Sequence, residues 1–241
     1  MTHDAGALAG ASVAEEEYLQ SIFWLQEAGL PRTAANVARA MQLSAPTVHE
    51  MVGRLERDGY VVRAADKSLD FTSEGLAQAE GIVRRHRLIE RFLTDVLQIP
   101  WDEVHEEAER MEHAMSPVLE ERMLAAIGAA KTCPHGHPIR SEDRIAGVPL
   151  ADVSPGASVH VLRFENEAED LLHYLKDAGL EPGERGELVA ADEEEVTVRL
   201  GGRPVTVTRS VAETVSVLAD PSPPPRTALP EHLVLAGRYG R

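Results

Sequence analysis

The 241-residue sequence predicts a mainly α-helical protein with an N-terminal winged helix-turn-helix, a helical middle segment and a small C-terminal β-barrel. Three observations predict this order. Two short helical patterns joined by a tight turn precede a β-hairpin pattern, long amphipathic helical patterns follow, and after Val148 the chain changes to short apolar runs typical of strands. The expected parts span 1–75, 76–147 and 148–219, followed by a Pro-rich tail at 220–241.

The N-terminal part begins with a helical pattern from Val13 to Gly29. Two further helices are expected over 34–41 and 46–58, joined by the turn QLSAP, in which Ser44 is the expected N-cap. The segment YVVRAADKSLDFT then contains two β-like runs around a polar turn. Because this hairpin directly follows the second helix, the pattern favours a winged unit over a plain pair of helices.

The middle segment is predicted to contain three helices. The first extends over 72–97 from a Thr cap, the second follows Pro100 and ends near Ser116, and the third begins with VLEERMLAAIG. Their apolar residues are expected to pack within a subunit or between subunits. These residues are Leu88, Phe92, Val96, Leu119, Met123 and Ile127.

One stretch of this segment, HEEAERMEHAMSP, is unusually rich in histidine and glutamate. An α-helix turns by about 100° per residue, so positions three and four apart share a face. The shared stripe consists of His105, Glu109, Glu112 and His113. From this stretch alone, an acidic face in water and a metal site are both open.

The segment KTCPHGHPIRSEDR marks the boundary before the strands. Cys133, His135 and His137 are residue types that bind metals, but their two-residue spacing does not match a structural zinc pattern. The segment is therefore expected to form a turn rather than a metal site.

The composition limits the classes of function. A net charge of −16 argues against broad, sequence-independent nucleic-acid binding, although it allows a local basic face. A single cysteine excludes an internal disulfide framework and indicates a reducing compartment. The sequence shows no signal peptide and no apolar run of the ~20 residues that a membrane span needs, so a cytoplasmic location is expected.

Three segments in this order carry a resemblance to a known family: SAPTVHEMVGRLERDGYV, RRHRL and EHAMS. Together with the winged helix and the terminal β-domain, the chain resembles the diphtheria toxin repressor family of metal-dependent transcriptional regulators. The resemblance implies a homodimer joined by the middle helices, a palindromic operator DNA, a divalent metal as co-repressor and no enzymatic activity. It also implies that the C-terminal barrel is SH3-like, of the FeoA type.

The resemblance further implies two metal sites. One would use Glu17, Glu109, Glu112 and His113, and a second would use His86, Glu90 and His105. In manganese-type members the histidine matching His86 belongs to the first cluster, so both assignments of His86 stay open. Additional ligands from the β-domain are implied by some members, and the candidates are Glu165, Asn166 and Glu167.

The residues at two of these positions favour manganese. Iron-responding members carry cysteine at the position of Glu109 and methionine at that of Glu17, and hard carboxylates suit Mn²⁺ better than sulfur does. Gln20 departs from the manganese-type pattern, which usually has glutamate there. The expected cofactor is therefore Mn²⁺, with Fe²⁺ or another divalent transition metal as the alternative.

The DNA-reading residues are expected at the start of the second helix of the winged unit and along it. They are Ser44, Pro46, Thr47, His49, Glu50, Arg54 and Arg57, with Arg63 and Lys67 on the wing as further phosphate contacts. A metal-dependent hydrolase and a metal store are the alternatives from other classes of function. A metal-dependent hydrolase would need an open coordination position and a nucleophile motif, and a metal store would not need a winged helix.

Overall fold

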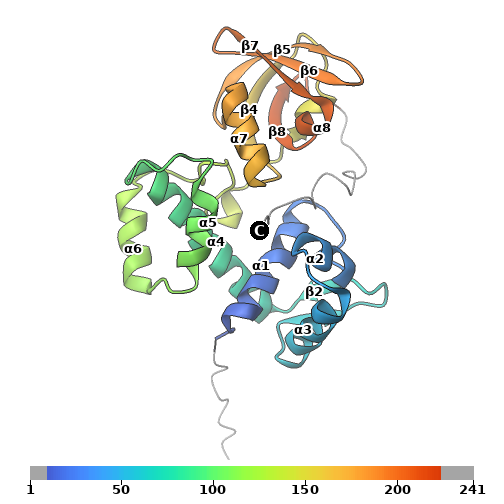
Figure 1. Cartoon of the computed structure of the whole chain (residues 1–241), viewed down its shortest axis with the longest axis vertical. Coiled ribbons are helices and arrows are strands. Elements are labelled where there is room, and N and C mark those ends of the chain that lie inside the picture. The colour runs from blue at the N-terminus through green and yellow to red at the C-terminus, as the bar shows by residue number, and fades with distance from the viewer. Residues whose placement is uncertain (1–9, 224–241) are drawn as a thin grey trace, which may run out of the picture.

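The computed structural model describes residues 10–223, and these form three units along the chain (Figure 1). Each unit has its own hydrophobic core: one from Tyr18 to Val83, one from Leu88 to Ile139 and one from Leu150 to Val217. The predicted tail at 220–241 falls almost entirely outside the described residues. Within residues 10–223, no helix combines the length and apolar character needed to cross a membrane.

The N-terminal unit contains the predicted helix-turn-helix and wing. Its elements are α1 (Val13–Glu27), α2 (Ala34–Ala40), α3 (Ala45–Arg57) and the antiparallel hairpin of β1 (Val61–Arg63) and β2 (Leu69–Phe71). Ser44 is the N-cap of α3, as expected, because its hydroxyl accepts a hydrogen bond from the Thr47 amide. Val48, Val52 and Leu55 of α3 are buried, so the remaining face of this helix points to solvent.

The helical unit packs three helices. They are α4 (Ser73–Asp95), α5 (Val104–Glu112) and α6 (Pro117–Ala126). Thr72 and Ser116 cap α4 and α6, as local hydrogen bonding predicts. The helix expected to reach Ser116 is shorter, since α5 ends at Glu112 and His113 is its C-cap.

The predicted apolar surface of this unit is smaller in the structure than expected. Leu88, Met123 and Ile127 lie in the core of the same chain, and Phe92 packs against that core. Val96 and Leu119 do remain exposed. Leu88 therefore packs within the subunit, because α4 is covered by α5 and α6 on that side.

The C-terminal unit is a six-stranded antiparallel sheet with the order β3-β8-β4-β5-β6-β7. The strands are β3 (Val148–Pro149), β4 (Ser158–Phe164), β5 (Arg185–Ala191), β6 (Glu195–Leu200), β7 (Arg203–Thr208) and β8 (Val215–Asp220). Short helices lie between them: η2 (Leu150–Asp152), α7 (Glu169–Ala178) and α8 (Arg209–Ala212). The sequence patterns did not indicate β3, α8 or β8.

The expected closed barrel is not formed by the described residues. The edge strands β3 and β7 do not pair with each other. β3 has two residues and runs directly into η2, and α8 packs against both η2 and β7. The helices thus occupy the place where the edges of the sheet would otherwise meet, and the sheet stays open.

The loop between α6 and β3 joins the units to one another. Gly136 in this loop has a φ of +91°, and a Cβ there would lie 1.9 Å from the Leu162 carbonyl oxygen on β4. Only glycine allows this approach. The loop is therefore held against the sheet, and Arg91 of α4 donates to its Thr132 and Cys133 carbonyl oxygens.

Candidate metal centre

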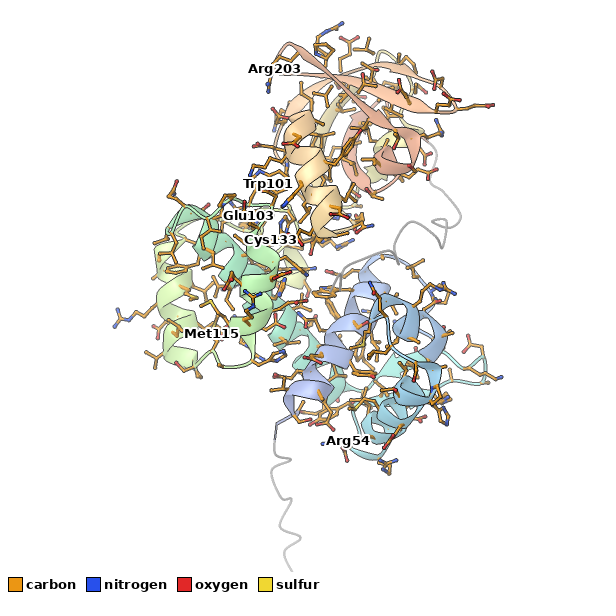
Figure 2. All side chains as sticks on the ribbon, in the orientation of Figure 1. Arg54, Trp101, Glu103, Met115, Cys133 and Arg203 are labelled. Atoms are coloured by element: carbon orange, nitrogen blue, oxygen red, sulfur yellow. The ribbon has the colours of Figure 1, made fainter. Side chains whose placement is uncertain are left out.

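Three neighbouring groups of histidine, glutamate and cysteine side chains lie where α1, α4, α5 and the 132–138 turn meet. Figure 2 labels Cys133 and Trp101 at the junction between the helical unit and the C-terminal unit. Arg54 of the DNA-reading helix lies at the far edge of the N-terminal unit in the same view. The candidate metal ligands and the candidate DNA contacts therefore lie in separate parts of the molecule.

The first group is centred on Glu112, whose side chain is 1% exposed. Its Oε2 lies 2.5 Å from His86 Nδ1 and accepts a hydrogen bond of 3.2 Å from Gln20 Nε2. Its Oε1 lies 3.4 Å from His113 Nε2. Glu112 of α5 thereby contacts α1, through Gln20, and α4, through His86.

His113 is paired with a residue that the sequence reasoning missed. Its Nδ1 lies 2.8 Å from Glu16 Oε2, and Arg85 donates to the other Glu16 oxygen at 2.8 Å. Glu16 is one of three consecutive glutamates, so the sequence signal was present but did not say which of them faces α5. Glu17, the residue implied by the resemblance, acts on His113 electrostatically and contributes to raising the pKa of His113.

Glu109 lies next to His105. Its Oε1 lies 3.5 Å from His105 Nε2, and its side chain is 36% exposed. Within the predicted set of Glu17, Glu109, Glu112 and His113, the structure places Glu112 beside His113 and Glu109 beside His105. Glu112 and His113 form its centre, and Glu109 lies at its border with the second group.

The second group surrounds Glu90, which is fully buried. Glu90 Oε1 lies 3.0 Å from His86 Nε2 and 3.2 Å from His105 Nδ1. The ligand-type atoms of His86, Glu90, His105 and Glu167 all lie within 4.8 Å of one another. The predicted trio of His86, Glu90 and His105 is thus assembled, and His86 contacts both the first and the second group.

Of the three candidates from the β-domain, which are Glu165, Asn166 and Glu167, Glu167 lies in this group. Its Oε2 is 3.7 Å from His105 Nδ1. Glu165 instead pairs with Arg163 at 2.7 Å, and Asn166 Oδ1 accepts from the Ala168 amide at 3.0 Å. Sequence reasoning could not separate these neighbours, because the choice depends on which one the sheet directs at α5.

The third group lies in the segment that the sequence predicts to be a turn and not a metal site. The turn is present, with the Cys133 amide donating to the His137 carbonyl at 2.8 Å. However, Cys133, His135 and His137 are all fully buried, and ligand-type atoms of Glu90, Cys133 and His135 lie within 4.8 Å of one another. A pattern within the turn could not indicate this grouping, because Glu90 comes from α4, which lies far from the turn along the chain.

The protonation of these residues reflects their mutual contacts. Burial disfavours the charged imidazole of His86, yet Glu90 and Glu112 raise its pKa well above the usual value. Burial likewise opposes charge on His105, but hydrogen bonds to Glu109 and Glu90 raise its pKa to about 9. The hydrogen bond to Glu16 raises the pKa of His113. Without a metal, protons on histidine therefore balance the buried carboxylates.

The donor set fits a divalent transition metal. Imidazole nitrogen and carboxylate oxygen are ligands for first-row divalent ions. Glu90 Oε2 is buried and has no hydrogen-bond partner among the described residues, which is unfavourable unless another group binds there. A cation bound between His86, Glu90 and His105 would take the place of the protons that these histidines carry.

The candidate DNA contacts form an exposed surface. All seven predicted residues on α3 or its N-cap are exposed: Ser44, Pro46, Thr47, His49, Glu50, Arg54 and Arg57. Arg54 lies 3.0 Å from Glu15 of α1 and 3.5 Å from Asp58, so part of its charge is balanced within the chain. Arg63 of the wing pairs with Glu56 at 3.1 Å.

Fold and site together indicate a class of protein: a winged-helix regulator with buried candidate ligands for a divalent metal between its N-terminal unit and its helical unit. Residues 12–69 match the iron-dependent repressor N-terminal DNA-binding domain, and residues 72–141 match the iron-dependent repressor metal-binding and dimerisation domain. Residues 148–219 match the FeoA domain.

Relatives and solved structures agree with these domain matches. The chain is 35% identical to the iron-dependent repressor IdeR of Mycobacterium tuberculosis over 223 residues, covering 84% of this chain and 95% of the relative. It is 33% identical over 216 residues to the diphtheria toxin repressor of Corynebacterium diphtheriae, and the match covers 84% of this chain and 95% of the relative. The chain belongs to the diphtheria toxin repressor family of metal-dependent transcriptional regulators.

Two solved structures resemble the whole chain. A manganese-dependent transcriptional repressor in complex with manganese has a TM-score of 0.78 and 29% identity, with 85% of this chain and 99% of that chain covered. IdeR of T. acidophilum has a TM-score of 0.73 and 28% identity, and the match covers 87% of this chain and 100% of that chain. The similar proteins thus include both iron-named and manganese-named repressors.

Proposed function

We propose that this protein is a manganese-responsive repressor that binds palindromic operator DNA as a homodimer when two metal sites are filled. The first site uses Glu17, Glu109, Glu112 and His113, and the second uses His86, Glu90 and His105 with Glu167 added from the β-domain. The domains would be the DNA-binding unit at 1–75, the metal-binding and dimerisation unit at 76–147 and the SH3-like unit at 148–219. The protein would act in the cytoplasm.

The observation that carries this proposal is the contact between α1 and α5 through ligand-type side chains. Gln20 Nε2 donates to Glu112 Oε2, and Glu16 contacts His113. α1 packs on α2 and α3, the helices that present the candidate DNA contacts. A divalent ion supplies positive charge that offsets the carboxylates of α1 and α5. The position of α1 relative to α4 and α5 is thereby coupled to the occupancy of the site.

This coupling makes the position of α3 depend on whether the metal site is occupied. In a dimer, the two copies of α3 must reach successive major grooves, about 34 Å apart. Holding α1 against α5 restricts the range of positions that each α3 samples. A metal favours this arrangement only to the extent that it binds it more tightly than the alternatives.

Manganese is favoured over iron by the chemistry of the first group. Glu17 and Glu109 provide oxygen at positions where iron-responding relatives have sulfur, and no sulfur atom belongs to the proposed first site. Oxygen and imidazole ligands suit Mn²⁺. Divalent ions later in the first transition row, such as Zn²⁺, bind such ligands more tightly when both ions are equally available. The iron-named relatives keep Fe²⁺ as the second candidate.

Operator binding with and without metal tests the proposal. Operators would be selected from random duplexes in Mn²⁺, and affinity would then be measured by mobility shift in Mn²⁺ and in chelator. We expect binding at least tenfold tighter in Mn²⁺, equal to ~1.4 kcal/mol of coupling free energy. Equal affinity in both conditions would contradict the proposed metal dependence.

The choice of manganese has its own test at Glu109. We expect Glu109→Cys to weaken the response to Mn²⁺ and strengthen that to Fe²⁺ or Co²⁺ under anaerobic conditions, because thiolate prefers later ions. Glu112→Ala is the comparison, since it removes a charge without adding sulfur and should weaken the response to every metal. A parallel loss in both variants would show that Glu109 does not set the preference.

A further inference from the structure

We propose that Asp102, between α4 and α5, is a positioning residue that pairs with Lys176 and His173 of α7 and thereby holds the C-terminal unit against the helical unit. The pairing places Glu167, which lies just before α7, beside His105. This inference rests on the proposed function, in which Glu167 completes the second metal site, and adds the interaction that brings Glu167 there.

Asp102 is a buried carboxylate whose cationic partner belongs to a different unit of the molecule. Its side chain is 5% exposed. Its Oδ1 accepts a hydrogen bond of 2.6 Å from Lys176 Nζ, and its Oδ2 lies 3.1 Å from His173 Nδ1. Burial of a carboxylate is costly unless a cation or a hydrogen-bond donor faces it. The ammonium of Lys176 therefore favours the arrangement in which α7 is docked on the helical unit.

The two partners of Asp102 lie on one face of α7. His173 and Lys176 are three residues apart, a spacing that places side chains on the same side of a helix. The residue before each of them, Leu172 or Leu175, is buried in the core of the C-terminal unit. The hydrogen bond to Asp102 raises the pKa of Lys176, so the ammonium stays charged. Thus α7 has an apolar face toward its own core and a basic face toward Asp102.

An apolar contact accompanies the ion pair. Trp101 packs against the core of the C-terminal unit, and its ring lies 5.8 Å from that of Phe164. The other side chains in this cluster come from 148–219. Trp101 lies at the junction of the helical unit with the C-terminal unit (Figure 2). Trp101 and Asp102 therefore attach the start of α5, which begins at Val104, to the C-terminal unit.

The same two segments meet a second time at a candidate metal ligand. Glu167 lies two residues before the start of α7 at Glu169, and its side chain is 4% exposed. Its Oε2 lies 3.7 Å from Nδ1 of His105, which follows Asp102 by three residues. The ion pair and the contact between Glu167 and His105 thus join the start of α5 to α7 and the residues just before it. Movement of α7 away from α5 would break both.

Docking of the C-terminal unit and metal binding are coupled through this arrangement. Domains of one chain move relative to each other unless their interface holds them. A metal that uses Glu167 binds the docked arrangement more tightly, so docking raises the affinity for the metal by the same factor by which the metal favours docking. Loss of the Lys176 ammonium should therefore weaken the second metal site through Glu167, although Lys176 is not itself a proposed ligand.

Lys176→Met tests the ion pair in the metal-free full chain, because it removes the charge and keeps most of the apolar stem. We expect acrylamide to quench tryptophan fluorescence more steeply than in the wild type. Trp24, the other tryptophan, is 5% exposed, so the change reports on Trp101. Lys176→Arg keeps the charge and should behave like the wild type. Lys131→Met is the matched control, because it removes an exposed ammonium that pairs with Asp143 at 3.1 Å.

Calorimetric titration with Mn²⁺ measures the effect on the second metal site. We expect Lys176→Met to weaken one of two Mn²⁺ sites about tenfold and to leave the other unchanged. Glu167→Gln should weaken the same site. Lys176→Met should add nothing to Glu167→Gln, because two changes that act through the same contact are not additive. Additive losses, or a Glu167→Gln variant that weakens neither site, would overturn the positioning role.

The outcomes separate this inference from the proposed function. Unchanged quenching in Lys176→Met would overturn the inference, and Mn²⁺-dependent operator binding would still support the repressor function. Steeper quenching with unchanged Mn²⁺ affinity would also overturn it, since the docked unit would not place Glu167. A wild type that neither binds Mn²⁺ nor responds to it at an operator would overturn the proposed function and with it the role of Glu167. Quenching of the metal-free protein would then still decide whether the ion pair holds the C-terminal unit.

Discussion

Gln20 is a single side chain that affects both the stability and the metal-binding ligands of the first group. It is 1% exposed, and its amide nitrogen donates to Glu112 Oε2 at 3.2 Å. A neutral donor at this position stabilises the Glu112 carboxylate when no metal is bound. A glutamate there would instead bring a second carboxylate to the same oxygen and offer a further metal ligand.

We therefore expect Gln20→Glu to act in opposite directions with and without metal. The metal-free protein should lose about 1–3 kcal/mol of unfolding free energy, because a buried donor is replaced by a like charge. Mn²⁺ should bind more tightly by at least tenfold, ~1.4 kcal/mol. Calorimetric titration and denaturation with and without Mn²⁺ measure both effects.

The control for this variant is Gln26→Glu, which makes the same chemical change on the exposed face of α1. It should leave Mn²⁺ affinity unchanged. If Gln20→Glu also leaves the affinity unchanged, the side chain of residue 20 does not reach the first site, and the path from α1 to Glu112 is wrong.

At the scale of elements, a buried ion pair links the end of α1 to α4. Arg87 pairs with both Glu27 oxygens, and Arg144, which follows η1 (Ser141–Asp143), donates to the Glu27 carbonyl at 3.0 Å. Arg87 also donates to the Pro138 carbonyl at 2.9 Å. The pair thereby connects the N-terminal unit, α4 and the loop that holds the third group.

This pair predicts acid sensitivity. Burial opposes ionisation of Glu27, but Arg87, with His137 and Arg144 also facing it, lowers its pKa from 4.5 to about 2. A carboxyl with a depressed folded-state pKa contributes stability above pH 4.5, and the contribution is lost as the pH falls from 4.5 toward 2. The shift corresponds to about 3 kcal/mol at ~1.36 kcal/mol per pKa unit.

We expect Glu27→Gln to lose part of this acid-dependent stability. The variant should be less stable at pH 7 by about 3–5 kcal/mol, because Arg87 stays buried without its partner, and it should change less between pH 4.5 and 2 than the wild type does. Urea denaturation at several pH values in this range measures the free energy of unfolding of both proteins. Glu56→Gln, in an exposed pair with Arg63, should behave like the wild type. Equal acid sensitivity of both variants would contradict the assignment.

The close approach of the 132–138 turn to β4 gives a second prediction at this scale. Gly136→Ala and Gly156→Ala both place a Cβ at a positive φ, +91° and +89°, so both should cost about 1–2 kcal/mol in backbone strain. At Gly136 the Cβ would also lie 1.9 Å from the Leu162 carbonyl oxygen, whereas nothing lies within 4 Å at Gly156.

We therefore expect Gly136→Ala to be the more destabilising of the two in thermal denaturation. Equal destabilisation by the two substitutions would show that the turn can move away from β4 without a further loss of stability.

At the scale of the whole molecule, two exposed apolar segments of the helical unit suggest where the proposed dimer forms. Val118 and Leu119 at the start of α6 are 68% and 42% exposed, and Val96 and Leu97 after α4 are 45% and 56% exposed. Contiguous exposed apolar residues of this kind are typical of interaction surfaces.

We expect Val118→Asp to weaken the dimer, because it places a charge among these apolar side chains. Sedimentation equilibrium at micromolar concentration should show a shift from about twice the chain mass toward the monomer. Val189→Asp, at an exposed position on β5, is the control and should not change the mass. A wild-type protein that is monomeric with metal present would contradict the dimer itself.

Interactions within a few residues made most of the local structure predictable. The Ser44 and Thr72 caps, the turn before α3 and the wing all depend on neighbours along the chain. The trio of His86, Glu90 and His105 was also identified before the structure, although through its resemblance to a family and not through its spacing. Its grouping in space is what the structure adds.

The remaining features depend on contacts between distant segments. Gln20 and Glu112 are separated by 92 residues, and Glu16 and His113 by 97, so no local pattern indicates which glutamate of 15–17 meets His113. The packing of β4 against the turn selects Glu167 over its neighbours and buries Cys133 and His135 beside Glu90. The sequence by itself determined the helices, their caps and the residue types of a metal site. Only the tertiary structure decided which side chains share a site, because burial and long-range packing bring them together.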